Sequence, residues 1–189
     1  MEISHQKVFK VCFYGPESTG KTTMASEMAR KFKTVYVPEV AREIINSNSF
    51  TTDDVIRIGV AQLERTEALL PSANKLLICD TDLITTRIYA QHYLGEVPEK
   101  LKDLEQLEKF DAYLLFDIDV PWVADGLRDL STLENRKAMF SLFKSALEQR
   151  NIAYHLIQGN YAERSRKVES LLNHFIRKLK ACPTMTPQS

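Results

Sequence analysis

The sequence predicts an α/β fold of three layers, in which a five-stranded, mainly parallel sheet carries helices on both faces. Short apolar runs alternate with amphipathic stretches along the chain, which is typical of parallel strands joined by helices. Two of these runs are almost entirely apolar, as expected of strands buried on both faces. A loop that begins with glycine separates the first apolar run from the first amphipathic stretch.

The first two elements are a strand at residues 8–14 and a helix at residues 21–33. The strand reads VFKVCFY and ends at a glycine, and its β-branched and aromatic side chains favour extended structure. Met24, Met28 and Phe32 recur at helical spacing, so they mark the face of the helix that packs on the sheet.

A short strand at residues 34–37 follows, and two helices are expected at residues 39–47 and 51–70. The second of these helices opens with Thr51, and Asp54 lies three residues later. This spacing resembles a capping box, in which the two side chains satisfy backbone N–H groups at the start of a helix.

The central part of the chain continues the alternation with two strands. Residues 75–79 read KLLIC and stop at an acidic residue, and residues 112–116 read AYLLF and also stop at one. Both runs are apolar enough for central strands of a parallel sheet. Between these two strands we expect helices at residues 83–93 and 98–109. After the second of them we expect a helix from residue 132 or 133 to residue 150, a fifth strand at residues 153–157 and a last helix at residues 161–179.

We expect one domain over residues 1–182. The polar segment near residues 119–136 is long for a simple connection, and it is interpreted as a lid that covers the site. The tail at residues 183–189 is expected to be disordered.

Composition excludes several classes of partner. The 25 basic and 25 acidic residues give a formal net charge of zero, so we expect neither nucleic acid nor a membrane surface as partner. No apolar run approaches the roughly 20 residues that span a bilayer. Three cysteines far apart in the sequence favour a reducing, cytoplasmic compartment. The last helix carries basic residues that are interpreted as a solvated face: Arg164, Arg166, Lys167, Arg177, Lys178 and Lys180.

Residues 15–22 read GPESTGKT and match the phosphate-binding pattern GxxxxGK[ST]. The pattern lies between a predicted strand and a predicted helix, which is the context that it requires. Glycines let successive N–H groups turn inward around a polyphosphate, Lys21 reaches the β and γ phosphates, and the Thr22 hydroxyl ligates Mg²⁺. The predicted nucleotide-binding residues are Gly15, Pro16, Glu17, Ser18, Thr19, Gly20, Lys21, Thr22 and Thr23.

A carboxylate at the end of a neighbouring strand is the second part of such a site. Asp80 follows the apolar run LLIC, and we predict that it completes the magnesium site with Thr22. Asp82 lies two residues later. It could bind the metal, bind the substrate, or cap the helix that begins near residue 83.

A phosphoryl acceptor also needs a carboxylate that orients its hydroxyl group. Glu39 follows the second strand, and Arg42 would share a helical face with it. We predict that this pair positions the acceptor, with Glu39 in the catalytic role; the alternative is a surface ion pair.

Two arginines in or next to the long polar segment, Arg128 and Arg136, are predicted to cover the transferred phosphoryl group. Trp122, the only tryptophan, lies in the same segment. Its ring would either stack on a ligand or anchor the segment to the core.

The motifs GPESTGKT, PEVAREI, CDTDLITT with the following Tyr89, and DVPWVADGLRD occur in that order and together resemble the NadR-type ribosylnicotinamide kinase family. The resemblance implies a P-loop kinase fold, ATP and Mg²⁺ as cofactors, and transfer of phosphate to the ribose 5′-hydroxyl of nicotinamide riboside in NAD salvage. Glu39 and Arg42 match the family's Glu-x-x-Arg after the second strand, and the phosphate loop, Asp80, Arg128 and Arg136 fall on the family's corresponding positions. The candidate acceptor-binding residues are thus Glu39, Arg42, Asp82, Tyr89 and Trp122.

The sequence departs from the family at one position, because fused members carry a tryptophan immediately before the glutamate and this chain has Pro38. Fused members also carry a nucleotidyltransferase domain with an HxGH-type signature, which this sequence lacks. We therefore expect no adenylyltransferase activity.

Two other functions are compatible with the motifs. A kinase for another nucleoside, nucleotide or small molecule would use the same loop, acidic residue and lid. An ATP-binding switch or ATPase module is a different class, although the NKxD motif of guanine-specific switches is incomplete at residues 74–77, NKLL.

Overall fold

The computed structural model describes residues 7–45, 49–123, 130 and 132–181. The tail at residues 183–189 and residues 124–129 and 131 of the lid segment lie outside this part of the chain, so the expectations of a disordered tail and of a lid are not tested. No helix in the described part is long and apolar enough to cross a membrane.

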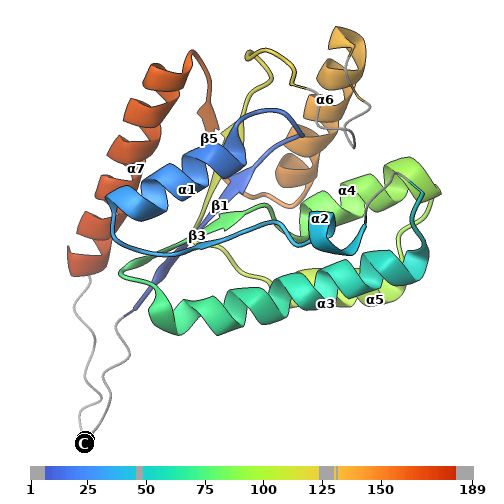
Figure 1. Ribbon diagram of the computed structural model, residues 1–189, viewed down its shortest axis with the longest axis horizontal. Helices are drawn as coiled ribbons and strands as arrows, with labels where there is room; N and C mark the ends of the chain where they lie inside the picture. The colour runs from blue at the N-terminus through green and yellow to red at the C-terminus, as the bar shows by residue number, and fades with distance from the viewer. Residues whose placement is uncertain (1–6, 46–48, 124–129, 131, 182–189) are drawn as a thin grey trace, which may run out of the picture.

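A parallel sheet of five strands forms the middle layer of the described structure (Figure 1). Its strands are β1 (Phe9–Tyr14), β2 (Tyr36–Val37), β3 (Leu76–Asp80), β4 (Ala112–Phe116) and β5 (Tyr154–Ile157). Their order is β2-β3-β1-β4-β5, and every pair is parallel. The predicted α/β fold with a five-stranded sheet is therefore confirmed.

The central strand β1 explains why the sheet is covered on both faces. Val11 and Phe13 belong to one buried cluster, whereas Cys12 and Tyr14 belong to another. Because successive side chains of a strand point to opposite faces, both faces of β1 contribute to a core. All four side chains are inaccessible to solvent.

Helices α1 (Lys21–Lys31) and α7 (Tyr161–Ala181) cover one face of the sheet, where Met24 and Met28 pack with Val168 and Leu172. Helices α4 (Leu83–Leu94) and α6 (Leu133–Gln149) cover the other face through Ile84, Met139 and Phe143. Helices α3 (Thr52–Leu69) and α5 (Glu99–Leu107) pack beside α4, as Figure 1 shows.

Most predicted elements agree with the structure to within a few residues. The capping box of Thr51 and Asp54 is present at the start of α3, and Pro71 lies in the short 3-10 turn Leu70–Ser72 that follows it. The clearest difference is α2, which spans only Ala41–Ile44 instead of beginning at Glu39. Glu39 therefore lies before the helix, whereas Arg42 lies within it.

Candidate active site

The phosphate loop joins the carboxyl end of β1 to the first turn of α1. Gly15, Ser18 and Gly20 have positive φ angles of 136°, 57° and 84°. A Cβ atom on Gly15 would lie 2.8 Å from the carbonyl oxygen of Phe116 in β4, so no other residue fits there. The loop curls at the N-terminus of α1, where N–H groups and the helix dipole favour an anion.

Lys21 is the first residue of α1, and its side chain folds back over the loop. Its Nζ atom donates to the carbonyl oxygen of Pro16 at 2.7 Å and to the hydroxyl of Thr19 at 3.4 Å. The Thr19 hydroxyl in turn donates to the same Pro16 oxygen at 2.9 Å. The lysine charge is therefore held beside the phosphate cradle, where both loop and lysine line one cavity.

Thr22 and Asp80 lie together beneath the loop. The Thr22 hydroxyl donates to Oδ2 of Asp80 at 2.5 Å, and Asp80 is the last residue of β3, with 1% of its surface exposed. Burial raises the pKa of the Asp80 carboxyl, while Lys21 and the Thr22 hydrogen bond lower it. A hydroxyl and a carboxylate beside a phosphate cradle are the oxygen donors that Mg²⁺ prefers, so these residues fit that ion.

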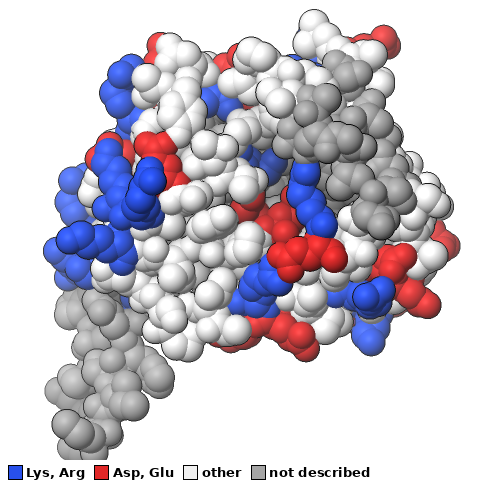
Figure 2. Space-filling view, viewed as in Figure 1, with Lys and Arg blue, Asp and Glu red and all other residues white. Residues whose placement is uncertain are grey.

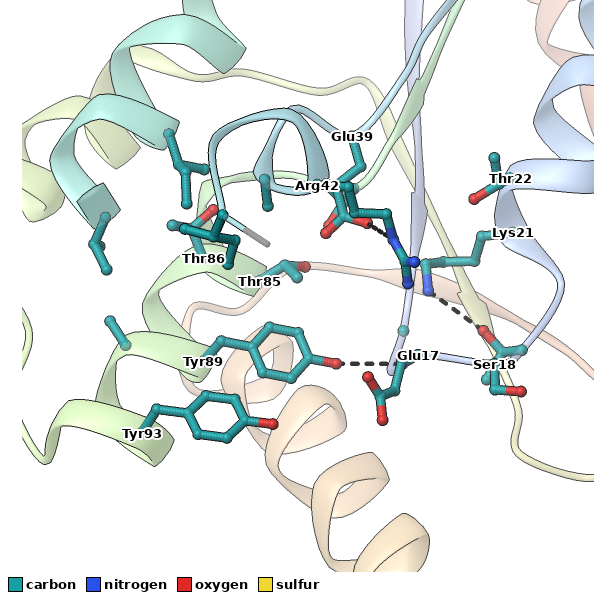
Figure 3. A pocket seen from close by; sticks show the side chains of 18 of the residues that line it. Glu17, Ser18, Lys21, Thr22, Glu39, Arg42, Thr85, Thr86, Tyr89 and Tyr93 are labelled. Carbon is teal, nitrogen blue, oxygen red and sulfur yellow. Dashed lines mark hydrogen bonds and ion pairs between the residues drawn. The ribbon is translucent and has the colours of Figure 1, made fainter. Parts of the chain in front are cut away.

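The cavity has a volume of about 180 Å³ and extends from the phosphate loop to an aromatic wall (Figure 3). Tyr89 and Tyr93 of α4 stack with ring centroids 6.2 Å apart and planes 18° apart. Phe50 meets the Tyr93 ring edge-on at 5.5 Å. Apolar and small side chains complete this half of the cavity: Ala41, Ile45, Val55, Ile58, Thr85, Thr86 and Ala90.

Tyr89 connects the aromatic wall to the phosphate loop. Its hydroxyl oxygen accepts a hydrogen bond from the backbone N–H of Glu17 at 3.2 Å. Burial raises the pKa of Tyr89 well above its usual value, and the nearby carboxylates of Glu17 and Glu39 raise it further. The phenol therefore stays neutral and can serve as a fixed part of the wall.

Glu39 and Arg42 both line the cavity and form an ion pair at 3.7 Å. The expectation that they share a helical face is wrong, because Glu39 precedes the short helix α2 and lies in the loop after β2. That loop nevertheless brings the carboxylate and the guanidinium together. Figure 3 shows both side chains reaching into the cavity from the side opposite Tyr89 and Tyr93.

Asp82 is the N-cap of α4, which was one of its three predicted roles. Its Oδ1 atom accepts hydrogen bonds from the backbone N–H and the hydroxyl of Thr85, both at 2.9 Å. Thr81, with a φ angle of 81°, precedes it at the turn into α4. Asp82 has no exposed surface and does not line the described cavity, and its roles in binding metal or substrate stay predictions.

Arg136 and Trp122 do not line the cavity in the described part of the chain. Arg136 is 8% exposed, donates to the carbonyl oxygen of Val120 at 2.9 Å and lies over the Trp122 ring. Trp122 packs on the core beneath α6, which favours the anchoring role. The role of Arg136 over the phosphates therefore stays a prediction, and Arg128 lies outside the described residues.

Arg164 is a residue that the sequence interpretation misplaced. It is 2% exposed, and its guanidinium donates to the carbonyl oxygens of Thr19, Asp117 and Gly159 at 2.8, 2.9 and 2.8 Å. It also pairs with the carboxylate of Asp119. The phosphate loop, the end of β4 and the turn before α7 are thus held by one side chain.

The remaining basic residues of α7 are exposed, as predicted: Arg166, Lys167, Arg177, Lys178 and Lys180. In Figure 2, basic side chains gather over α7 and the neighbouring end of α1, on the left of the molecule. No signal in the sequence separates Arg164 from these neighbours except its place in the first turn of the helix.

Comparison with known proteins assigns the family. A family model described as an AAA domain matches residues 10–164, which include the phosphate loop, Asp80 and Arg164. The chain belongs to this family. The AAA domain match covers β1 to the first turn of α7, so it contains the whole cavity described above.

Two curated relatives are the trifunctional NAD biosynthesis/regulator proteins NadR of Salmonella typhimurium and Escherichia coli. The first is 29% identical over 167 residues, which cover 85% of this chain and 41% of the relative. The second is 30% identical over 159 residues, which cover 81% of this chain and 39% of the relative. The chain spans about two-fifths of the length of these relatives.

Solved structures show the same fold. A NadR protein in complex with NR has a TM-score of 0.72 and 21% identity, with 96% of this chain and 54% of that chain covered. A NadR protein in complex with NAD and AMP-PNP has a TM-score of 0.71 and 22% identity, with 96% of this chain and 52% of that chain covered. Thymidylate kinase from Candida albicans has a TM-score of 0.62 and 15% identity, with 92% of this chain and 93% of that chain covered. The fold is thus that of P-loop kinases.

Proposed function

We propose that this chain is an ATP- and Mg²⁺-dependent kinase that phosphorylates the ribose 5′-hydroxyl of nicotinamide riboside. The observation that carries the proposal is a single cavity with two unlike ends. One end is the phosphate loop with Lys21 and Thr22, and the other is the aromatic wall of Tyr89 and Tyr93. A nucleoside-sized acceptor would bind between them with its hydroxyl group facing the phosphates.

The reaction moves the γ-phosphoryl group of ATP to the acceptor oxygen. A bond forms between phosphorus and the 5′-oxygen, the bond to the β-phosphate oxygen breaks, and the hydroxyl proton is released. Lys21 stabilises charge on the phosphates, and Glu39 orients the hydroxyl, with Arg42 holding its carboxylate. When bound, Mg²⁺ neutralises phosphate charge, and Thr22 and Asp80 are the residues that would hold it.

The wall suits an aromatic ring that carries positive charge. Stacked tyrosine rings attract a cation at their faces, and the carboxylates of Glu17 and Glu39 lie close enough to raise the pKa of Tyr89. The nicotinamide ring of the riboside is such a cation. Where fused family members carry tryptophan this chain has Pro38, so Tyr89, Tyr93 and Phe50 would supply the ring contacts here.

The relatives support the same reading. Two are named for NAD biosynthesis and regulation, one NadR structure contains NR, and another contains NAD and AMP-PNP. AMP-PNP is an analogue of ATP. Because this chain spans only part of those proteins, the kinase activity rests on the cavity and its phosphate loop.

The experiment is an acceptor comparison with product analysis. The purified protein is incubated with ATP, Mg²⁺ and either nicotinamide riboside or an ordinary nucleoside, and products are identified by mass spectrometry. The proposal expects nicotinamide mononucleotide, with a kcat/KM at least tenfold above that of any nucleoside. A preference for an ordinary nucleoside or nucleotide would move the substrate, and ATP hydrolysis with no phosphorylated acceptor would favour an ATPase module.

A further inference from the structure

Within α7, all of which the structure describes, Arg164 is the only buried basic residue. Burying a guanidinium is costly unless its N–H groups have partners. Arg164 offsets that cost with three backbone carbonyl groups and the carboxylate of Asp119. One of the three carbonyl groups belongs to Thr19 of the phosphate loop, so this side chain connects the last helix to the loop.

The first turn of α7 fixes the backbone from which Arg164 extends. The N–H of Asn160 donates to Oε2 of Glu163 at 2.8 Å, and the N–H of Glu163 donates to Oδ1 of Asn160 at 3.1 Å. Such a reciprocal pair caps the start of a helix. The carboxylate of Asp119, which pairs with Arg164, also accepts from the N–H of Gly159 at 2.6 Å. The guanidinium is therefore anchored before it reaches the phosphate loop.

Thr19 is held through both its side chain and its carbonyl group. Its hydroxyl donates to the Pro16 carbonyl and accepts from Nζ of Lys21, while its carbonyl oxygen accepts from Nη1 of Arg164 at 2.8 Å. The Thr19–Gly20 peptide is trans, and in a planar trans peptide the C=O and N–H groups point in opposite directions. The N–H of Gly20 is thus directed away from Arg164. Gly20 is exposed and lines the cavity, whereas Arg164 does not line it.

We propose that Arg164 is a positioning residue for ATP, which holds the Thr19 carbonyl so that the N–H of Gly20 is set to donate to the phosphates. The inference rests on the proposed function, because it takes the phosphate loop as the ATP site, but it does not depend on the acceptor. A donor that is fixed before the ligand arrives needs no reorganisation on binding. Without the guanidinium, the Thr19–Gly20 peptide would be free to rotate and to turn its carbonyl oxygen toward the phosphates, where it would repel them.

Arg164→Lys tests this role because it keeps the positive charge and removes the planar fork. Nε, Nη1 and Nη2 of the arginine serve the carbonyl groups of Gly159, Thr19 and Asp117, and a single ammonium group cannot hold all three. Calorimetric binding of inorganic tripolyphosphate with Mg²⁺ reports on the phosphate loop alone, and binding of nicotinamide riboside reports on the acceptor half of the cavity. We expect the Kd of tripolyphosphate to rise at least about tenfold, with that of the riboside changed less than about threefold. In steady-state kinetics, the KM of ATP should rise with the Kd of tripolyphosphate.

Two further variants make the result specific. Arg164→Ala removes the whole side chain, and guanidinium ion, well below the concentration that unfolds the protein, should restore its binding of tripolyphosphate. Methylammonium carries the same charge without the planar fork and should not restore it. Arg166→Ala removes an exposed basic side chain of the same helix and should leave the binding of both ligands unchanged.

The inference fails if Arg164→Lys binds tripolyphosphate as tightly as the wild type, or if methylammonium restores binding as well as guanidinium does. It also fails if Arg164→Lys loses both ligands equally and melts at a lower temperature, because Arg164 would then support the fold alone. Failure of the wild type to bind tripolyphosphate would overturn both the proposed function and this inference. Failure to bind only the riboside would overturn the proposed acceptor, and the tripolyphosphate measurements would still decide the role of Arg164.

Discussion

At the scale of single residues, the site depends on charged side chains that are held in fixed positions. Lys21 is fixed beside the phosphate cradle by Pro16 and Thr19, and Asp80 is buried against the Thr22 hydroxyl. Phosphoryl transfer needs little covalent assistance from a protein, so positioning and charge stabilisation account for most of the catalysis. Removing one of these groups should therefore damage turnover more than folding.

Lys21→Ala tests this directly. Lys21 is half-buried at the start of α1 and belongs to none of the apolar clusters, and its Nζ atom donates to Pro16 and Thr19 of the loop, so we expect its loss to leave the core intact. We expect kcat/KM to fall by at least about a hundredfold, with the melting temperature changed by only a few degrees. Steady-state kinetics and a thermal melt of the same preparation provide both numbers. Melting of the variant at room temperature would show that Lys21 is a structural residue instead.

At the scale of elements, the start of α4 brings two buried carboxyl groups together. Asp82 caps the helix, and Oε2 of Glu108, at the end of α5, accepts from the N–H of Leu83 at 2.7 Å. Burial and the neighbouring carboxylate raise the pKa of Glu108, and burial raises the pKa of Asp82. The folded protein therefore holds protons here that the unfolded chain would release.

This arrangement predicts a dependence of stability on pH. A carboxyl whose pKa is raised by folding stabilises the fold below its unfolded-state value, about 4.3 for glutamate, and that stability is lost as the pH rises toward the folded value. Glu108→Gln stays neutral and keeps an oxygen acceptor for Leu83. Between pH 5 and pH 8 we expect its urea midpoint to fall less than that of the wild type.

The matched control is Glu99→Gln, because Glu99 is an exposed glutamate on the same helix. Its midpoint should follow the wild-type slope across that pH range. If Glu108→Gln follows the same slope, the buried pair does not contribute to the pH dependence.

At the scale of the whole molecule, the ends of the strands position the site, and the buried side chains of the central strands stabilise the fold. Leu77 of β3 has no exposed surface and packs with Val37 and Cys79. Leu77→Ala removes buried methyl groups from this core and leaves the cavity wall unchanged, because Leu77 is absent from that wall. We expect the free energy of unfolding to fall by about 2–5 kcal/mol, measured by urea denaturation, with the KM of the acceptor nearly unchanged. A large change in KM with full stability would contradict this division.

The strands and the phosphate loop could be predicted from the sequence, because burial on both faces and close backbone contacts restrict residue choice. The run LLIC and the loop GPESTGKT carry that information locally. The capping role of Asp82 was among the alternatives that the sequence left open, whereas the contacts of Arg136 and Arg164 could not be predicted, because they are made with segments distant in the chain. A turn at Thr81 precedes the buried Asp82, and Arg164 binds carbonyl groups at Thr19 and Asp117.

The measurement that tests the central claim most directly is acceptor-dependent release of ADP. Wild-type protein and Lys21→Ala are compared with Mg²⁺ and ATP, with and without nicotinamide riboside. We predict that the riboside stimulates ADP release by the wild type, in equal amount to the mononucleotide formed, and that Lys21→Ala shows almost none. ADP release by the wild type that is unaffected by the riboside would contradict the assignment of the cavity as the active site of a kinase for this acceptor.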